Sequence, residues 1–212
     1  MWKIDNNIIS NRGNTLAYLF SLEENIGTDE VSLKESMKDV VLKRYDYAEF
    51  GTGRGNSTKI IHELKPKKSD LYTFDSFQGL PEDWKVGKYV RNIKGDFKFD
   101  KPKWLDKEED IILYEGLFKD TLPEFLKKKK EPLAFINIDC DIYKSTYEVL
   151  DNLNDLIIPG TIIHFDDFYN YGGDLWLMHE YLALMHFVIK YNRYFIYLGR
   201  TNNSQVWIKI II

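Results

Sequence analysis

Residues 47–64 have the sequence YAEFGTGRGNSTKIIHEL, in which a short apolar run is followed by three closely spaced glycines and a helix-forming segment. We expect Tyr47–Phe50 to form a strand and Asn56–Leu64 to form a helix that ends near Pro66, because proline cannot continue a helix. The glycines between them permit a tight turn and a close approach of the backbone to a ligand. A strand, a glycine turn and a helix in this order are typical of an α/β fold.

Apolar runs alternate with helix-forming segments along the rest of the chain. Strands that are apolar on both faces are typical of a buried parallel sheet, with crossover helices between them. The further strands are expected at 71–74, 111–114, 133–138 and in the run ending at Phe165, and the crossover helices at 121–129, 143–156 and 174–190. The last β-rich runs, 194–198 and 205–211, are joined by a connection that suits an antiparallel hairpin. The sequence predicts an α/β, Rossmann-like, doubly wound and mostly parallel sheet with helices on both faces.

The length of 212 residues and the hydrophobic fraction of 44% suit one packed domain, which we expect to span 1–212. Within it, 1–44 are expected to form an N-terminal helical segment, with helices at about 14–26 and 29–43, and 45–212 the core. The interval 78–110 is rich in glycine, proline and lysine and is long for a connection. We interpret it as an insertion that acts as a lid.

Composition limits the function classes. The formal net charge is −4 and the charges are mixed, so no broad basic face is available for nucleic acid. Cys140 is the only cysteine, which excludes an internal disulfide and suits a reducing compartment. The N-terminus lacks a signal-peptide core, and the apolar stretch 175–189 is interrupted by polar residues. We expect a cytoplasmic protein that has no membrane segment.

Carboxylates follow two of the expected strands. Asp139 and Asp141 come after one apolar run, and Asp166 and Asp167 come after the next, 27 residues beyond Asp139. That separation fits one helix and one strand, so these acids can meet at adjacent strand ends. Carboxylates this close repel one another unless a cation lies between them, and oxygen ligands favour magnesium, calcium or manganese. Aspartates that cap helices or form turns are the alternative.

The glycine turn reads GxGxG at Gly51, Gly53 and Gly55, whereas a dinucleotide-binding loop requires GxGxxG. Glu49 precedes the turn, and a carboxylate there suits the α-amino group of S-adenosylmethionine better than a pyrophosphate. A purely structural glycine turn is the alternative.

Two further strand ends also carry acids. Asp75, followed by Ser76, could accept hydrogen bonds from ribose hydroxyls, although NAD-binding proteins use the same device and a turn-forming role is the alternative. Glu115 and Gly116 follow the third strand, where the adenine would lie, and Glu115 could equally be a surface acid.

A general base is expected among these groups. Asp139 and Asp141 are the first candidates, and Asp141 could instead be a further metal ligand or an acid at a helix N-terminus. His164 lies two residues before Asp166 and is a further candidate, with a buried core histidine as the alternative.

Five phrases together resemble the macrocin O-methyltransferase family, within the class I S-adenosylmethionine-dependent methyltransferases. They are EFGTGRGNST (49–58), FDSFQGLPE (74–82), EGLFKDTLP (115–123), INIDCDIYKSTYEVL (136–150) and PGTIIHFDDF (159–168). The resemblance implies a seven-stranded sheet with a reversed last hairpin, a methyl donor over the first two strand ends and a divalent cation, usually magnesium. Asp139, Asp166 and Asp167 match the metal-ligand positions.

The resemblance implies a metal-assisted O-methyltransferase acting on a hydroxyl of a sugar, another small polyol or a natural product. The resemblance leaves the oligomeric state open, with a homo-oligomer as one option, because substrate sites in the family can borrow residues from a partner chain. The alternatives are an NAD-dependent oxidoreductase, which the loop spacing disfavours, and an inactive nucleotide-binding interaction module, which would have no reason to keep the acids.

Overall fold

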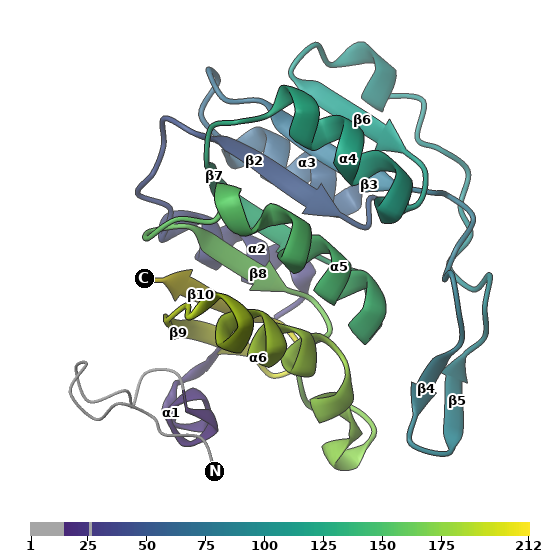
Figure 1. Cartoon of the computed structure of the whole chain (residues 1–212), viewed down its shortest axis with the longest axis vertical. Helices are drawn as coiled ribbons and strands as arrows, with labels where there is room; N and C mark the ends of the chain where they lie inside the picture. The colour runs from purple at the N-terminus through teal and green to yellow at the C-terminus, as the bar shows by residue number, and fades with distance from the viewer. Residues whose placement is uncertain (1–14, 26) are drawn as a thin grey trace.

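The computed structural model describes residues 15–25 and 27–212 (Figure 1). In this part of the chain the main sheet has eight strands in the order β1-β9-β10-β8-β7-β2-β3-β6. Their bounds are β1 Glu24–Asn25, β2 Asp46–Phe50, β3 Leu71–Asp75, β6 Ile111–Glu115, β7 Leu133–Ile138, β8 Ile162–Phe165, β9 Phe195–Thr201 and β10 Val206–Ile210. The predicted mostly parallel α/β sheet is confirmed, but it has one strand more than expected.

The additional strand is β1, which pairs in parallel with β9 at the edge of the sheet. It lies in the segment 14–26 for which we expected one helix; α1 instead ends at Ser21 (Leu16–Ser21), and residues 14 and 26 are outside the described part. Arg200 of β9 donates hydrogen bonds to the carbonyl of Leu22 and to Glu24, so contacts with the sheet edge outweigh the local helical pattern. The predicted helical character of 1–44 is therefore only partly correct, and 1–14 are not described.

The central strands are parallel and their carboxyl ends meet at one edge of the sheet. β2 pairs with β3 on one side and with β7 on the other. β7 and β8 are adjacent, with Ile138 opposite Phe165, so the expected neighbourhood of the two acid-bearing strand ends is confirmed. The hairpin of β9 and β10 is antiparallel, as expected.

Helices cover both faces of the sheet (Figure 1). One face carries α4 (Phe118–Lys128), α5 (Tyr143–Leu153) and α6 (Glu180–Tyr191); the other carries α2 (Asp29–Lys38) and α3 (Asn56–Leu64). The segment expected as a single helix at 174–190 is divided into the 3-10 helix η4 (Gly173–Met178) and α6. His179 between them has a non-helical backbone, which ends the first helix and turns the chain into α6.

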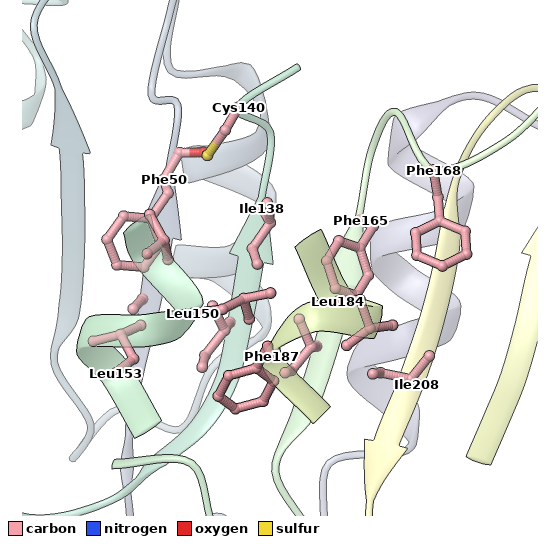
Figure 2. Close-up of a cluster of buried hydrophobic side chains, with 14 of the residues drawn as sticks. Phe50, Ile138, Cys140, Leu150, Leu153, Phe165, Phe168, Leu184, Phe187 and Ile208 are labelled. Atoms are coloured by element: carbon pink, nitrogen blue, oxygen red, sulfur yellow. The ribbon is translucent and has the colours of Figure 1, made fainter. Parts of the chain in front are cut away.

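The core lies between the sheet and these helices. Figure 2 shows side chains of three adjacent strands, Phe50, Ile138 and Phe165, facing Leu150 of α5 and Leu184 of α6. A second cluster, which includes Leu33 and Ile61, fills the space under α2 and α3. Successive side chains of a strand point to opposite faces of the sheet. The polar residues that precede Phe50, Ile138 and Phe165, namely Glu49, Asn137 and His164, therefore point toward α2 and α3.

The insertion 78–110 contains a separate hairpin of β4 (Trp84–Val86) and β5 (Tyr89–Asn92) and the 3-10 helix η2 (Leu105–Lys107). Another 3-10 turn, η3 (Asn154–Leu156), follows α5. Across the described ranges, no helix is both long enough and apolar enough to cross a bilayer.

Candidate active site

A cavity of about 400 Å³ opens at the carboxyl ends of the parallel strands. It receives residues from the loops after β2, β3, β6, β7 and β8 and from the insertion. The residues that line it are Gly51, Gly53, Asp75, Ser76, Gly79, Leu80, Pro81, Trp84, Arg91, Phe97, Phe99, Gly116, Leu117, Phe118, Lys119, Asp139, Cys140, Asp141, Lys144, Ser145, Glu148, Asp166 and Asp167. Nine of the thirteen residues that the sequence predicted for the site are among them.

The strand order explains why the cavity lies here. From β2 the chain proceeds outward through β3 to β6, and then crosses to β7 on the other side of β2. Ligands of open α/β sheets bind where the order reverses in this way, because the loops on either side diverge. Gly51 and Asp139, which follow β2 and β7, lie on the two sides of this point.

Gly51 brings these two loops into contact. Its N–H donates to the carbonyl of Phe74 (2.9 Å), and the N–H of Asp139 donates to the carbonyl of Phe50 (2.9 Å). Its φ of +100° favours glycine, and a Cβ at this position would lie 1.9 Å from the carbonyl oxygen of Asp139. Glycine is therefore required here by packing as well as by backbone conformation.

Asp75 closes the other side of the glycine turn. Its carboxylate accepts hydrogen bonds from the N–H of Gly53 and the N–H of Phe77, each at 2.7 Å. Ser76 and Gly116 line the cavity next to it. A carboxylate has about four acceptor positions, so Asp75 keeps capacity for ligand hydroxyls.

The insertion covers the glycine turn. The Arg54 guanidinium carbon lies 4.7 Å from the centre of the Phe99 ring. A Cβ built on Gly53 would lie 3.6 Å from atoms of the same ring. Gly55, with φ +75°, faces Trp104 instead, and a Cβ there would lie 2.9 Å from the indole. Gly55 thus packs beneath the insertion and does not line the cavity.

Glu49 does not reach the cavity either. It is fully buried and accepts hydrogen bonds from the Thr58 hydroxyl (2.5 Å), the Thr73 hydroxyl (3.1 Å) and the Asn137 amide (3.3 Å). Burial raises the pKa of Glu49. Its expected contact with a cofactor amino group does not fit this placement, because its partners hold it on the α3 side of the sheet.

Glu115 is exposed and lies 3.7 Å from Lys101, so the surface alternative describes its position in the structure.

His164 belongs to the same buried network as Glu49. It donates from Nδ1 to the Asn137 side-chain oxygen (2.7 Å), and its Nε2 lies 2.9 Å from the Ser32 hydroxyl, which leaves Nε2 as the acceptor. Burial lowers the pKa of His164 to about 3. Both nitrogens are engaged away from the cavity, so the core-histidine alternative describes its position and His164 is omitted from the proposal below.

The four predicted aspartates lie close together. The Asp141 carboxyl lies within hydrogen-bonding distance of Asp167. One carboxylate oxygen from each of Asp139, Asp166 and Asp167 lies within 4.8 Å of the other two. Like charges at that separation repel by roughly 3 kcal/mol per pair near a protein surface. Burial, followed by the nearby carboxyl of Asp166, raises the pKa of Asp139 well above its usual range.

These three carboxylates, which we call the acid corner, fit a divalent cation. Oxygen ligands bind magnesium and calcium at about 2.0–2.6 Å, so two ligands of one ion lie up to about 5 Å apart. The observed spacing meets this condition, and the donor set contains the hard oxygens that such ions prefer.

Asp141 has an unusual backbone. The Ile142 N–H donates to the carbonyl of Cys140 (2.6 Å), which closes a three-residue turn with Asp141 at its centre and φ +61°. Burial and the neighbouring carboxyl of Asp167 raise the pKa of Asp141 well above its usual range. Strained non-glycine residues are found preferentially at functional sites.

Two residues near these acids were not predicted from the sequence. Glu180, fully buried at the start of α6, accepts hydrogen bonds from the N–H groups of Cys140 and Asp167. A glutamate within the apolar run 175–189 was the available signal, because such residues are rarely buried without partners.

The second residue is Arg91 of β5, which lines the cavity and packs its guanidinium over Trp84 (4.6 Å) and Tyr171 (4.9 Å). The insertion contains many cations, and nothing in the pattern distinguishes this one.

The strand order, the glycine turn at the reversal point and the acid after the next strand define a Rossmann-like fold of the kind found in S-adenosylmethionine-dependent methyltransferases. The chain belongs to the macrocin O-methyltransferase (TylF) family, whose model matches residues 30–187. The family resemblance carried by the five sequence phrases is thereby confirmed.

Two relatives are similar in sequence. The 8-demethyl-8-(2,3-dimethoxy-alpha-L-rhamnosyl)-tetracenomycin-C 4'-O-methyltransferase of Streptomyces olivaceus is 28% identical over 58% of this chain and 52% of its own length. The demethyldecarbamoylnovobiocin O-methyltransferase of Streptomyces niveus is 25% identical over 65% of this chain and 58% of its own length. The chain thus matches just over half the length of these relatives.

Solved structures share the fold. The calicheamicin methyltransferase CalS11 superposes with a TM-score of 0.68 at 19% identity, over 85% of this chain and 78% of that one. The O-methyltransferase NovP gives 0.64 at 21% identity, over 86% and 79%. At these identities the likeness establishes the fold.

Proposed function

We propose that this chain is an S-adenosylmethionine-dependent, divalent-metal-assisted O-methyltransferase acting on a hydroxyl of a sugar or glycoside. The observation that carries the proposal is a single cavity lined both by the glycine turn with Asp75 and by the acid corner. A methyl donor and a metal-held acceptor would therefore be neighbours in the same space, as direct transfer between them requires.

The donor side is the half of the cavity formed by β2, β3 and β6. Backbone at Gly51 and Gly53 would hold the amino-acid end of the donor, where an absent Cβ permits close approach. Asp75 would accept the ribose hydroxyls, and the stretch from Gly116 to Phe118 would contact the adenine.

The acceptor side is the half formed by the loops after β7 and β8. Asp139, Asp166 and Asp167 would hold the cation, magnesium being our first choice. When bound, the donor supplies an electrophilic methyl group and the cation supplies Lewis acidity that lowers the pKa of a hydroxyl.

Asp141 would take the hydroxyl proton. It lines the cavity two residues after Asp139, and its position at the centre of a strained turn fixes its carboxylate beside the corner. Asp139 is the second candidate for this role.

The acceptor class is inferred from the relatives. One is named for methylating a rhamnosyl tetracenomycin and the other for methylating demethyldecarbamoylnovobiocin. The cavity agrees with a hydroxyl-rich acceptor that also has apolar parts, because Trp84, Phe97 and Pro81 line it together with carboxylates. We further propose that the chain forms one methyltransferase domain, with 45–212 as its core, and that the insertion closes over the bound donor.

Calorimetry separates this function from its rivals. We expect S-adenosylhomocysteine to bind and NAD not to bind, because the glycine turn lacks the dinucleotide spacing. Binding of NAD alone would favour an oxidoreductase, and binding of neither compound would favour an interaction module.

Turnover tests the metal role. Asp166→Ala should lower metal-dependent methyl transfer by at least about 100-fold, because it removes one of three ligands, while S-adenosylhomocysteine affinity stays within about twofold. Methyl transfer from radiolabelled S-adenosylmethionine to a panel of glycosides, with magnesium or with a chelator, measures this. Undiminished turnover of the variant in chelator would reject the metal role.

A further inference from the structure

Glu180 is a buried carboxylate that lies beneath the acid corner without belonging to it. It is the first residue of α6, and its side chain has no exposure to solvent. The glutamate cannot reach an acceptor in the cavity, because it is absent from the residues that line it. Its role must therefore be exerted through its neighbours.

Both oxygens of Glu180 accept hydrogen bonds from backbone. Oε1 accepts the N–H of Cys140 at 3.4 Å, and Oε2 accepts the N–H of Asp167 at 3.1 Å. Cys140 separates Asp139 from Asp141, and Asp167 is itself a member of the corner. One side chain thus joins the loop after β7 to the loop after β8.

The two loops are also joined at other points, because the side chains of Asp141 and Asp167 lie within hydrogen-bonding distance. At the strand ends, the N–H of Asp166 donates to the carbonyl of Ile138 at 3.0 Å. Beyond that point the two loops diverge: the loop after β7 enters the strained turn at Asp141, and the loop after β8 continues toward Phe168. The carboxylate of Glu180 spans the gap just after the last backbone contact.

We propose that Glu180 is a positioning residue that sets the distance between Asp139 and the Asp166–Asp167 pair, and thereby the affinity of the acid corner for a divalent cation. This inference rests on the proposed metal role of the corner. Outer groups that orient metal ligands in this way typically change metal affinity 10- to 100-fold when they are replaced.

A simpler role for Glu180 is to stabilise α6, because an acid in the first turn of a helix interacts favourably with the helix dipole. If that were its only role, Glu180→Asp would leave the metal affinity of the acid corner unchanged. Glu180→Asp would keep this charge but shorten the side chain by one methylene, so it could not reach both N–H groups. Glu180→Gln would keep the length, but an amide has one acceptor oxygen and one donor nitrogen, so it cannot accept from both.

Glu49→Gln is the matched control. Glu49 is equally buried and the substitution is identical, but its partners are two hydroxyls and a side-chain amide, which can rotate to suit a new amide. It contacts none of the residues of the acid corner through these bonds.

The experiment measures Mn²⁺ binding by electron paramagnetic resonance, S-adenosylhomocysteine binding by calorimetry and the melting temperature for the full chain and each variant. We expect Glu180→Gln and Glu180→Asp to weaken Mn²⁺ binding by about 10- to 100-fold. Both should keep S-adenosylhomocysteine affinity within about twofold, and Glu49→Gln should leave Mn²⁺ affinity unchanged.

Unchanged Mn²⁺ affinity in Glu180→Asp would overturn the inference while the proposed function stands, and so would an equal loss in Glu49→Gln. If Glu180→Gln does not fold, Glu180→Asp alone decides. Failure of the unaltered chain to bind Mn²⁺ would instead contradict the metal role itself, and the inference with it.

Discussion

At the scale of single residues, Asp141 has a backbone conformation that costs an aspartate about 1–3 kcal/mol. Asparagine or glycine would relieve part of this cost, but neither supplies a carboxylate. The strain is offset by the loops around it, because Ile142 bonds back to Cys140 and Cys140 is held by Glu180. The rigid part of the site is thus the backbone that presents the acids.

Gly51 and Gly53 provide a test of how tightly the two halves of the cavity are packed. Gly51→Ala should lower the free energy of unfolding by about 3 kcal/mol, because its Cβ would collide with the Asp139 carbonyl and its φ of +100° disfavours alanine. Gly53→Ala should cost only about 1 kcal/mol, because its Cβ would meet Phe99 at an ordinary 3.6 Å. Urea denaturation without ligand measures both, and equal losses would contradict the packing described here.

The buried His164 should make the free energy of unfolding depend on pH. The folded protein keeps its imidazole neutral down to about pH 3, whereas the unfolded chain binds the proton below about pH 6.5. The unfolded state therefore gains protons first on acidification, and stability falls by up to about 1.4 kcal/mol per pH unit between these values. His164→Asn should show a shallower fall between pH 7 and pH 5 in urea denaturation. Parallel curves for the two proteins would mean that His164 is not held neutral.

At the scale of elements, the hairpin of β4 and β5 is attached to the domain mainly through aromatic contacts. Trp84 packs edge-on against Tyr171 and His179, and His179 Nε2 donates to the carbonyl of Lys85 at 2.7 Å. Arg91 lies over Trp84 and Tyr171. These contacts link the insertion to η4 at the mouth of the cavity.

Arg91→Ala should loosen this hairpin. Loss of two cation–π contacts corresponds to about 1–2 kcal/mol of local opening free energy, so the amides of 84–92 should exchange with deuterium about 5- to 30-fold faster. Lys88→Ala is the control, because Lys88 makes its cation–π contact with Tyr89 at the tip of the same hairpin. Equal exchange in the two variants would show that Arg91 does not hold the hairpin.

The elements differ in how far the sequence determines them. The predicted bounds of α3 and β7 agree with the structure, because a strong hydrophobic pattern is flanked there by glycines or proline. The strand β1 was missed because two polar residues carry no β pattern and pair only through β9. The hairpin β4–β5 was missed for a similar reason: its residues are mostly exposed, and its fixing contacts come from 171 and 179, far along the chain.

The site divides in the same way. Positions that depend on strand ends, such as Asp75, Asp139 and Asp166, were predictable, because parallel strands end at one edge. The face of the sheet to which each side chain points was harder to predict from the sequence. Glu49 and His164 alternate with Phe50 and Phe165 along their strands and point to the opposite face, where Asn137 and Ser32 hold them.

At the scale of the whole molecule, the family match covers residues 30–187, which contain the residues that line the cavity. The C-terminal hairpin lies outside that match but still contacts the site, since the Gln205 amide donates to Asp166 at 3.1 Å. The sheet therefore supports the acid corner from three sides: β7, β8 and the β9–β10 turn. This arrangement explains how carboxylates that repel one another can be kept close together before a cation binds.

Anomalous diffraction from crystals grown with Mn²⁺ and S-adenosylhomocysteine would locate a bound cation and the nucleoside in the same experiment. We predict one anomalous peak among the carboxylates of Asp139, Asp166 and Asp167, with the nucleoside beside Asp75 and its sulfur facing that peak. Absence of a peak at the acid corner, with S-adenosylhomocysteine bound in the cavity, would contradict the proposed metal site.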